Sequence, residues 1–178
     1  MIPRSFSTIS YRIHSFLSEE VCREKKILTI ALLTAMPCLV WAANYEAGDN
    51  ADAGSLPRAT AVGSGATASA HRSTALEAGA TASETYPIAV GQHTVAKGSG
   101  ATALGSEASA EGNSSTAIGT ESKTTADSAV AVGAESEAAQ SATALGFDSK
   151  AIGGSSVAVG ADNASGDYSI AVGEETQY

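Results

Sequence analysis

Two histidines, His71 and His93, are the only imidazoles beyond the first 42 residues of the chain. An imidazole can act as a general base or a metal ligand, and both roles need partner groups at matching positions. The chain repeats itself about every 14 residues, as described below, and the two histidines occupy different positions of that repeat. Because no nucleophile–base pair accompanies them, we expect both in outward loops. We predict no enzyme activity, no catalytic residue, no metal site and no cofactor.

Carboxylates are the second group that could do chemistry, because clustered oxygen ligands bind Ca²⁺. Here they scatter through the turn positions of the repeat, and Asp162 and Asp167 lack the spacing of a calcium loop. We interpret them as a solvated face that also discourages open strand edges from aggregating. These turn acids are Glu107, Glu111, Glu121, Asp127, Glu135, Glu137, Asp148, Asp162, Asp167, Glu174 and Glu175.

Two aromatic residues, Phe147 and Tyr168, also stand in turn positions. Exposed aromatic rings supply much contact area in binding, so both are candidate ligand-contact residues. They could equally pack over the edge of the structure. The variable residues of the turns are the ones we expect to choose a ligand.

The first 42 residues are typical of a leader. A basic segment (Arg23, Lys25 and Lys26) precedes an apolar run over 27–41, and Val40-Trp41-Ala42 fits a signal-peptidase site. We predict an extended signal peptide over 1–42 and no membrane span after its removal. The run is short for a span, so a retained anchor is the weaker alternative.

Both cysteines, Cys22 and Cys38, lie in this leader, which removes disulfides and thiolate metal sites from the mature chain. Lipidation of Cys38 is a weaker alternative. From residue 43 onward the chain has 5 basic and 16 acidic residues, a net charge of −11. This excess argues against nucleic acid or an anionic membrane as partner, since both require a basic surface.

A repeat organises the chain from residue 59 onward. An alanine recurs at intervals of 14 residues for the first six copies and then at 13, 14 and 13. It is preceded by a β-branched residue and followed by an aliphatic one, a period-2 pattern that predicts a short strand in each copy. The aliphatic residues, which we predict as the structural core of the repeat, are Val62, Leu76, Val90, Leu104, Ile118, Val132, Leu145, Val159 and Val172.

A glycine follows the aliphatic residue in eight of nine copies, with Glu77 as the exception. A glycine at a strand end marks a bend that needs positive φ or the close approach of another backbone. A second, weaker alternation of small residues follows, so each copy contains two strands and two turns. The predicted turn glycines are Gly63, Gly91, Gly105, Gly119, Gly133, Gly146, Gly160 and Gly173.

Stacked copies of such a unit form an all-β solenoid, in which each copy buries its apolar side against its neighbours. We expect the aliphatic column to line a narrow interior opposite Ala, Ser and Thr, because bulky residues on both walls would overpack it. One aliphatic residue per turn buries little area against the entropy of ordering 14 residues, so we also expect oligomerisation. The thin alanine face, or the β-branched column beside it, is the expected contact between chains.

The closest repeat units, Ser115-Thr116-Ala117-Ile118-Gly119, 156–160 and 169–173, resemble the head repeat of the YadA-like trimeric autotransporter adhesins of Gram-negative bacteria. The resemblance extends over about Ala59 to Gly173, and the leader is similar in kind to the extended signal peptides of that family. It implies a left-handed parallel β-roll over 59–178, preceded by a linker or cap over 43–58. It also implies a homotrimer that is secreted through the inner membrane and attaches cells to other surfaces.

The expected partners are therefore a host matrix protein (collagen-like, fibronectin or laminin), a cell-surface ligand or other bacteria, held multivalently. Members of the family continue into a coiled-coil stalk and a membrane anchor, and neither is visible in this sequence. We therefore expect a fragment or truncated product, displayed on the outer membrane where an anchor is supplied. The alternative is a secreted structural or ice-binding solenoid, which the partial row of Thr60, Thr74, Thr102, Thr116 and Thr143 would serve.

Overall fold

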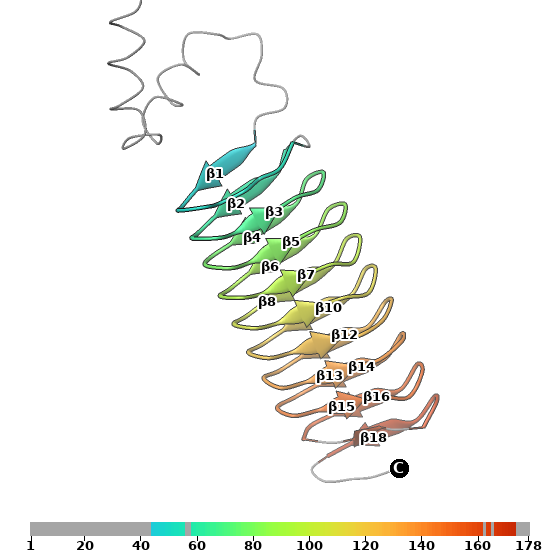
Figure 1. The fold of residues 1–178 in the computed structure, drawn as a ribbon. Coiled ribbons are helices and arrows are strands. Elements are labelled where there is room, and N and C mark those ends of the chain that lie inside the picture. Colours follow the sequence, from blue (N-terminus) through green and yellow to red (C-terminus); the bar gives the residue numbers. More distant parts are fainter. Residues whose placement is uncertain (1–43, 56–57, 162, 165, 174–178) are drawn as a thin grey trace, which may run out of the picture. The chain divides into compact units, whose positions relative to one another are not determined.

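The computed structural model describes residues 44–55, 58–161, 163–164 and 166–173. The predicted leader lies outside these residues. The described chain winds as a ladder of stacked coils with two parallel sheets and, over these residues, no helix (Figure 1). The expected all-β parallel solenoid of about nine repeats is confirmed.

Strands of three residues form one wall, a ten-stranded parallel sheet. Its members, in spatial order, are β1 (Tyr45–Ala47), β2 (Thr60–Val62), β4 (Thr74–Leu76), β6 (Ile88–Val90), β8 (Thr102–Leu104), β10 (Thr116–Ile118), β12 (Val130–Val132), β14 (Thr143–Leu145), β16 (Val157–Val159) and β18 (Ile170–Val172).

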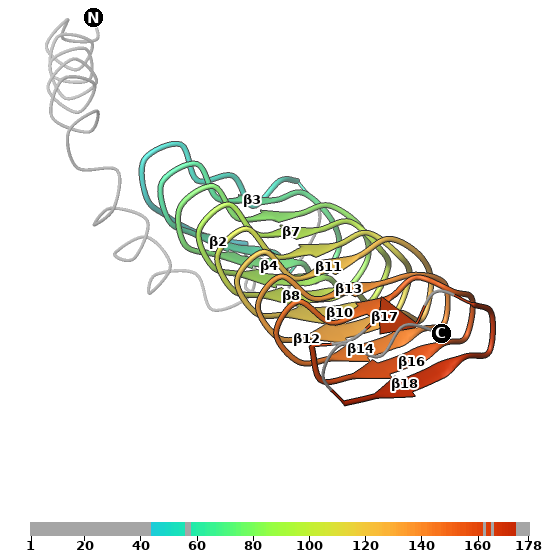
Figure 2. The same ribbon diagram turned by 90° about the horizontal axis from the view of Figure 1, so that it is seen from below.

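Strands of two residues form the opposite wall, an eight-stranded parallel sheet, and Figure 2 shows the two walls of the flattened coil. Its members are β3 (Thr67–Ala68), β5 (Thr81–Ala82), β7 (Val95–Ala96), β9 (Ser109–Ala110), β11 (Lys123–Thr124), β13 (Glu137–Ala138), β15 (Lys150–Ala151) and β17 (Asn163–Ala164). We refer to one coil as a rung, to the turns that leave the ten-stranded sheet as the glycine edge, and to the turns that lead back to it as the return edge.

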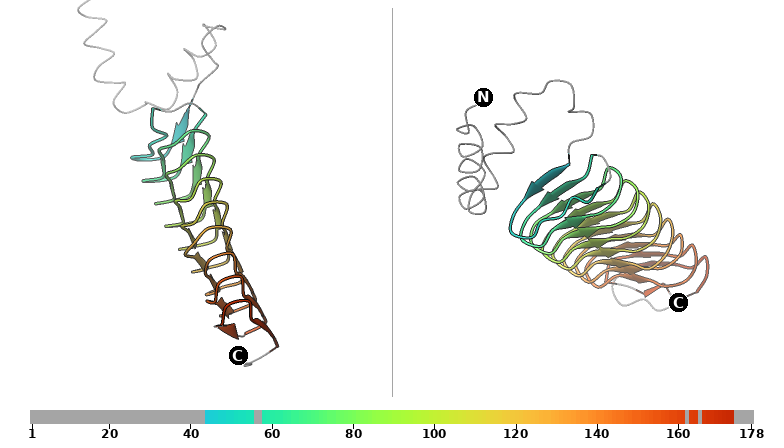
Figure 3. Two further views of the ribbon diagram at one scale, coloured as in Figure 1. Left: turned by 90° about the vertical axis from the view of Figure 1, so that its right-hand side faces the viewer. Right: turned by 45° about the horizontal axis from the view of Figure 1, so that its top comes forward.

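Register is kept from rung to rung, as the stacked view in Figure 3 illustrates. Alanine pairs with alanine along the ten-stranded sheet, for example Ala103 with Ala117 and Ala117 with Ala131. The two missing residues are absorbed in turns. The return turn after β13 has four residues where others have five, and the glycine-edge turn after β16 has three where others have four. The second deletion therefore lies before Asn163, at the opposite edge from Asp167.

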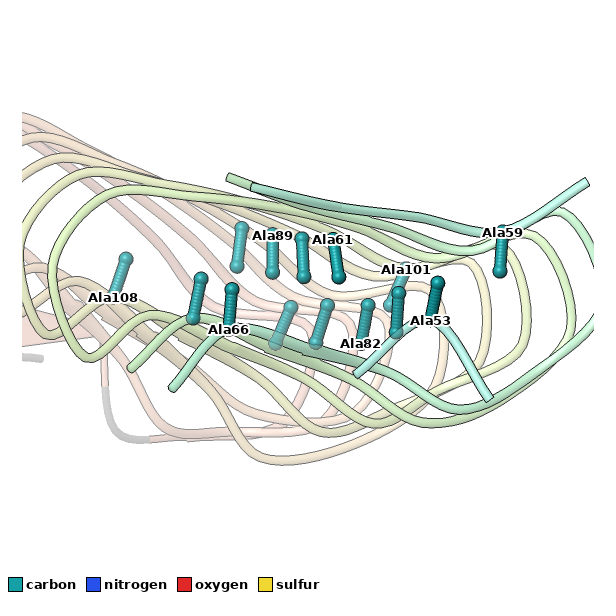
Figure 4. Close-up of a cluster of buried hydrophobic side chains, with 14 of the residues drawn as sticks. Ala53, Ala59, Ala61, Ala66, Ala82, Ala89, Ala101 and Ala108 are labelled. Carbon is teal, nitrogen blue, oxygen red and sulfur yellow. The ribbon is translucent and has the colours of Figure 1, made fainter. Parts of the chain in front are cut away.

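The interior is lined by small residues from both walls. Every alanine of the repeat column is fully buried, and Figure 4 shows Ala61 and Ala89 of one wall facing Ala66 and Ala82 of the other. Buried hydroxyls join them. The described core contains, besides alanines, Ser73, Pro87, Thr94, Ser115, Ser122, Thr124, Ser136, Ser149 and Ser156.

The expectation that the aliphatic column lines this interior is wrong for the single chain. Side chains alternate across a strand, so burying the alanine turns its aliphatic neighbour outward. Ile118, Leu145 and Val172 are 37%, 38% and 64% exposed, and the other members of the column are partly exposed. The walls are joined by turns of only three or four residues, a gap that side chains no larger than threonine, valine or proline fill. The corrected column is Val62, Leu76, Val90, Leu104, Ile118, Val132, Leu145, Val159 and Val172.

The turn glycines have φ between 108° and 138°, and each approaches the backbone of the next rung. A Cβ added to Gly119 would lie 2.4 Å from the carbonyl oxygen of Gly133. The close approach and the positive φ therefore act together at this position. Glu77, which replaces glycine in one rung, adopts φ 85°.

We predict that Gly119→Ala destabilises the coil by about 2–3 kcal/mol, because it adds backbone strain and a clash that no rotamer can relieve. Gly65→Asn is the matched control. Gly65 has φ 68° with no atom within 4 Å of an added Cβ, and His93 and Glu107 occupy its position in other rungs. Thermal unfolding followed by circular dichroism should show a lower midpoint for Gly119→Ala alone. Equal midpoints for the two variants would contradict the prediction.

The first rung differs from the others, because polar side chains enter its interior positions. Glu46 pairs in register with Ala61, and its Oε1 accepts a hydrogen bond from the Ala53 N–H at 2.9 Å. Asn44 accepts from the Ala59 N–H at 3.1 Å and donates to the Gly54 carbonyl at 2.7 Å. These bonds satisfy backbone groups at the N-terminal end of the ladder, where there is no preceding described strand to pair with β1.

Candidate binding surfaces

The outer face of the ten-stranded sheet is an uncharged stripe that runs from β2 to β18. It consists of the aliphatic column and of the β-branched column on the other side of the alanines. Exposure is greatest at Ile88, 42%, and at Ile170, 67%. A continuous stripe of this kind marks an interaction surface on a soluble protein. The β-branched column is Thr60, Thr74, Ile88, Thr102, Thr116, Val130, Thr143, Val157 and Ile170.

The outer face of the eight-stranded sheet is polar and carries alternating charges. Lys123 pairs in register with Glu137, which pairs with Lys150. On the same wall Lys97 lies 3.7 Å from Glu111, and Lys150 forms an ion pair with Asp148. Opposite charges along the axis stabilise adjacent rungs modestly, since exposed ion pairs contribute about 0–1 kcal/mol each. This face suits water, and the two faces of the coil are therefore chemically distinct.

The glycine edge carries four acids in successive rungs: Glu107, Glu121, Glu135 and Asp148. All four have φ between 52° and 61°, and each donates its N–H to a carbonyl of the preceding rung at 2.9 Å. Among the described residues, no group of three acidic or histidine side chains is arranged to hold a metal ion. His93 is exposed on the same edge.

Three side chains on the return edge bond to the backbone of the preceding rung. Asn113 Oδ1 accepts from the Ser99 N–H at 2.9 Å, and Asp127 Oδ1 accepts from the Asn113 N–H at 2.7 Å. Asp167 Oδ1 accepts from the Gly154 N–H at 2.8 Å. These residues hold successive turns together. Asp162, the other residue weighed as a calcium ligand, lies outside the described residues.

The two candidate ligand-contact residues do not form one site. Phe147 is 61% exposed on the glycine edge, and Tyr168 is 82% exposed on the return edge. Both are accessible to a partner. Since opposite edges carry them, a single small ligand cannot touch both in one chain.

Sequence reasoning missed a group of side chains on the return edge. His71 is half-buried there, with its ring centroid 6.2 Å from that of Tyr86 and the two planes at 62°. Arg72 Nη1 donates to Tyr86 Oη at 3.2 Å, and its Cζ lies 5.2 Å from the centroid of the ring. Arg58 occupies the position of Arg72 one rung earlier. We refer to Arg58, His71, Arg72 and Tyr86 as the arginine–tyrosine cluster.

The signal for this cluster was present in the sequence. Arg72 and Tyr86 are 14 residues apart, which is one full repeat, so the solenoid must place them side by side. His71 and His93 are both in turns, at different edges. The period therefore predicts contacts as well as strands.

A parallel coil with a thin small-residue interior and one long uncharged face is a repeat scaffold, and its chemistry is that of surfaces. The family model described as the YadA head domain repeat (2 copies) matches residues 57–76, 82–108, 110–136, 138–163 and 163–176. These matches cover more than half of the chain, which belongs to the YadA head domain family. No curated protein gives a significant match.

Heads of this family are exposed at the cell surface as parts of trimeric autotransporter adhesins, a non-enzymatic class. The resemblance found in the repeat units is thereby confirmed. Within the described residues there is no helix with the length and hydropathy needed to cross a membrane.

Proposed function

We propose that the chain is the head of a homotrimeric adhesin that attaches cells to a host matrix protein, a host cell or another bacterium. Collagen-like proteins, fibronectin and laminin are the matrix ligands to test. Each rung presents turn residues at a regular spacing, so an extended ligand meets many similar weak contacts. Their effects combine through multivalency.

The uncharged stripe on the ten-stranded sheet is the observation that carries this proposal. The opposite wall bears the lysines and glutamates, and the stripe between β2 and β18 bears none. Three chains that turn their stripes toward a common axis would bury the aliphatic column and leave both edges free. That arrangement supplies the apolar burial that an alanine interior alone cannot provide.

Several further steps belong to the same proposal. Residues 1–42 direct secretion through the inner membrane, and an anchor supplied with the head holds it at the outer membrane. Residues 43–58 cap the solenoid. Support for the cap comes from Glu46 and Asn44, whose side chains occupy the ends of the two walls.

The test is the mass of the purified protein in solution, together with attachment of cells that display it to immobilised collagen, fibronectin and laminin. We expect three times the mass of one chain and a β-rich circular dichroism spectrum. We also expect attachment to at least one of the three matrix proteins. A stable monomer at micromolar concentration would argue for the structural or ice-binding alternative.

A further inference from the structure

The arginine–tyrosine cluster has the geometry of a prepared anion site. Arg58, Arg72 and Tyr86 take the same position in three successive rungs, with φ of 67°, 57° and 64°. Rungs are about 4.8 Å apart, so these side chains start from one line along the return edge. The Tyr86 N–H donates to the His71 carbonyl at 3.0 Å, which fixes the turn of one rung to the next.

Within the cluster, Arg72 is held and Tyr86 remains accessible. The bond to Tyr86 Oη uses one of five guanidinium N–H groups, and the other donors stay available. His71 supports the ring from its edge, and Tyr86 is still 51% exposed. A side chain that is already ordered loses less entropy when it binds a ligand.

The positive charge here is not neutralised by the chain. The described residues include five basic side chains, and three of them face acids on the eight-stranded wall: Lys97 with Glu111, Lys123 with Glu137, and Lys150 with Asp148 and Glu137. Within the described part, neither Arg58 nor Arg72 forms an ion pair. The chain as a whole carries a net charge of −9, so this edge is its local exception.

We propose that the arginine–tyrosine cluster binds an acidic sugar of a glycan chain. The guanidinium groups take its carboxylate or sulfate in a forked, charge-assisted contact, and the exposed ring of Tyr86 packs against the flat apolar side of the sugar. An acidic peptide offers the anion without that rigid flat surface. This inference rests on the proposed adhesin function and names one chemical class of ligand for it.

The experiment measures binding of the purified protein to immobilised heparin-type sulfated glycan, to hyaluronan and to polyglutamate. We expect binding to at least one glycan and much weaker binding to polyglutamate. Arg72→Gln should lower the glycan affinity about tenfold, which corresponds to one lost hydrogen-bonded charge contact. Lys123→Gln, the matched loss of one charge on the other wall, should change it less than about twofold, the effect of a distant screened charge.

Two further variants sharpen the test. Glu84→Gln removes an exposed acid two residues before Tyr86 and should strengthen binding, and Tyr86→Phe should weaken it because Arg72 loses its hydroxyl partner. Circular dichroism of each variant shows that the coil is intact.

Preference for the sulfated or the carboxylated glycan identifies which anion the site takes. Equal binding to polyglutamate, equal effects of Arg72→Gln and Lys123→Gln, or binding to neither glycan would overturn the inference. Trimer mass and attachment to matrix proteins, measured on the same material, report separately on the proposed function.

Discussion

Replacing Ala117 by leucine is expected to prevent the middle of the coil from folding. Ala117 is fully buried on β10, between Ala103 and Ala131 in register, and it points at the opposite wall. Both walls are backbone with small side chains, so three added carbons cannot be accommodated by a rotamer change. Overpacking costs about 1–3 kcal/mol in ordinary cores, and a core with so little freedom should lie at or above the upper end. Loss of the β spectrum, or a large fall in the thermal midpoint, is the measurement.

The control for Ala117→Leu is Thr124→Val in the same rung. Thr124 Oγ1 is buried without a hydrogen-bond partner in the described structure, and valine has nearly the same shape. Removing an unsatisfied hydroxyl should leave stability unchanged or raise it by about 1 kcal/mol, the usual cost of an unmade bond. An unaltered midpoint in Ala117→Leu would show that the interior is wider than its side chains indicate.

The repeat predicted the architecture well, because a fixed period constrains every copy at once. A single Ala-Val-Gly triplet is uninformative, but nine in phase require stacked strands with the alanines in line, as the pairing of Ala61 with Ala75 shows. The shortened repeats were also readable, since a missing residue in a turn leaves strand register unchanged. The location of the second deletion, before Asn163, depended on knowing which turn was shorter.

The period could not decide which side of each strand faces inward. Alternation gives two assignments, alanine in or Val, Leu and Ile in, and the ordinary preference for burying the larger residue selected the wrong one. The deciding quantity is the gap between walls, which short turns such as 119–122 keep narrow. The aliphatic column consequently becomes the outer stripe, where its burial requires other chains.

Substitution of Leu104 by aspartate is therefore expected to break the trimer and leave the interior of each coil unaltered. Leu104 lies on β8, in the middle of the stripe, and points away from the alanines. In the proposed trimer three carboxylates would meet near the common axis. Burying a carboxylate without a partner costs on the order of several kcal/mol per ion, which exceeds what one rung of apolar contact supplies. Solution mass should fall from trimer to monomer.

Ser109→Asp is the matched control, because Ser109 lies on β9 of the same rung and faces outward on the polar wall. Its mass should stay that of a trimer. Assembly also predicts that the thermal midpoint of the unmodified protein rises with concentration, since association stabilises the folded chain by mass action. A Leu104→Asp protein that remains trimeric would place the contact between chains elsewhere, on one of the two edges, and the stripe would then need a different partner.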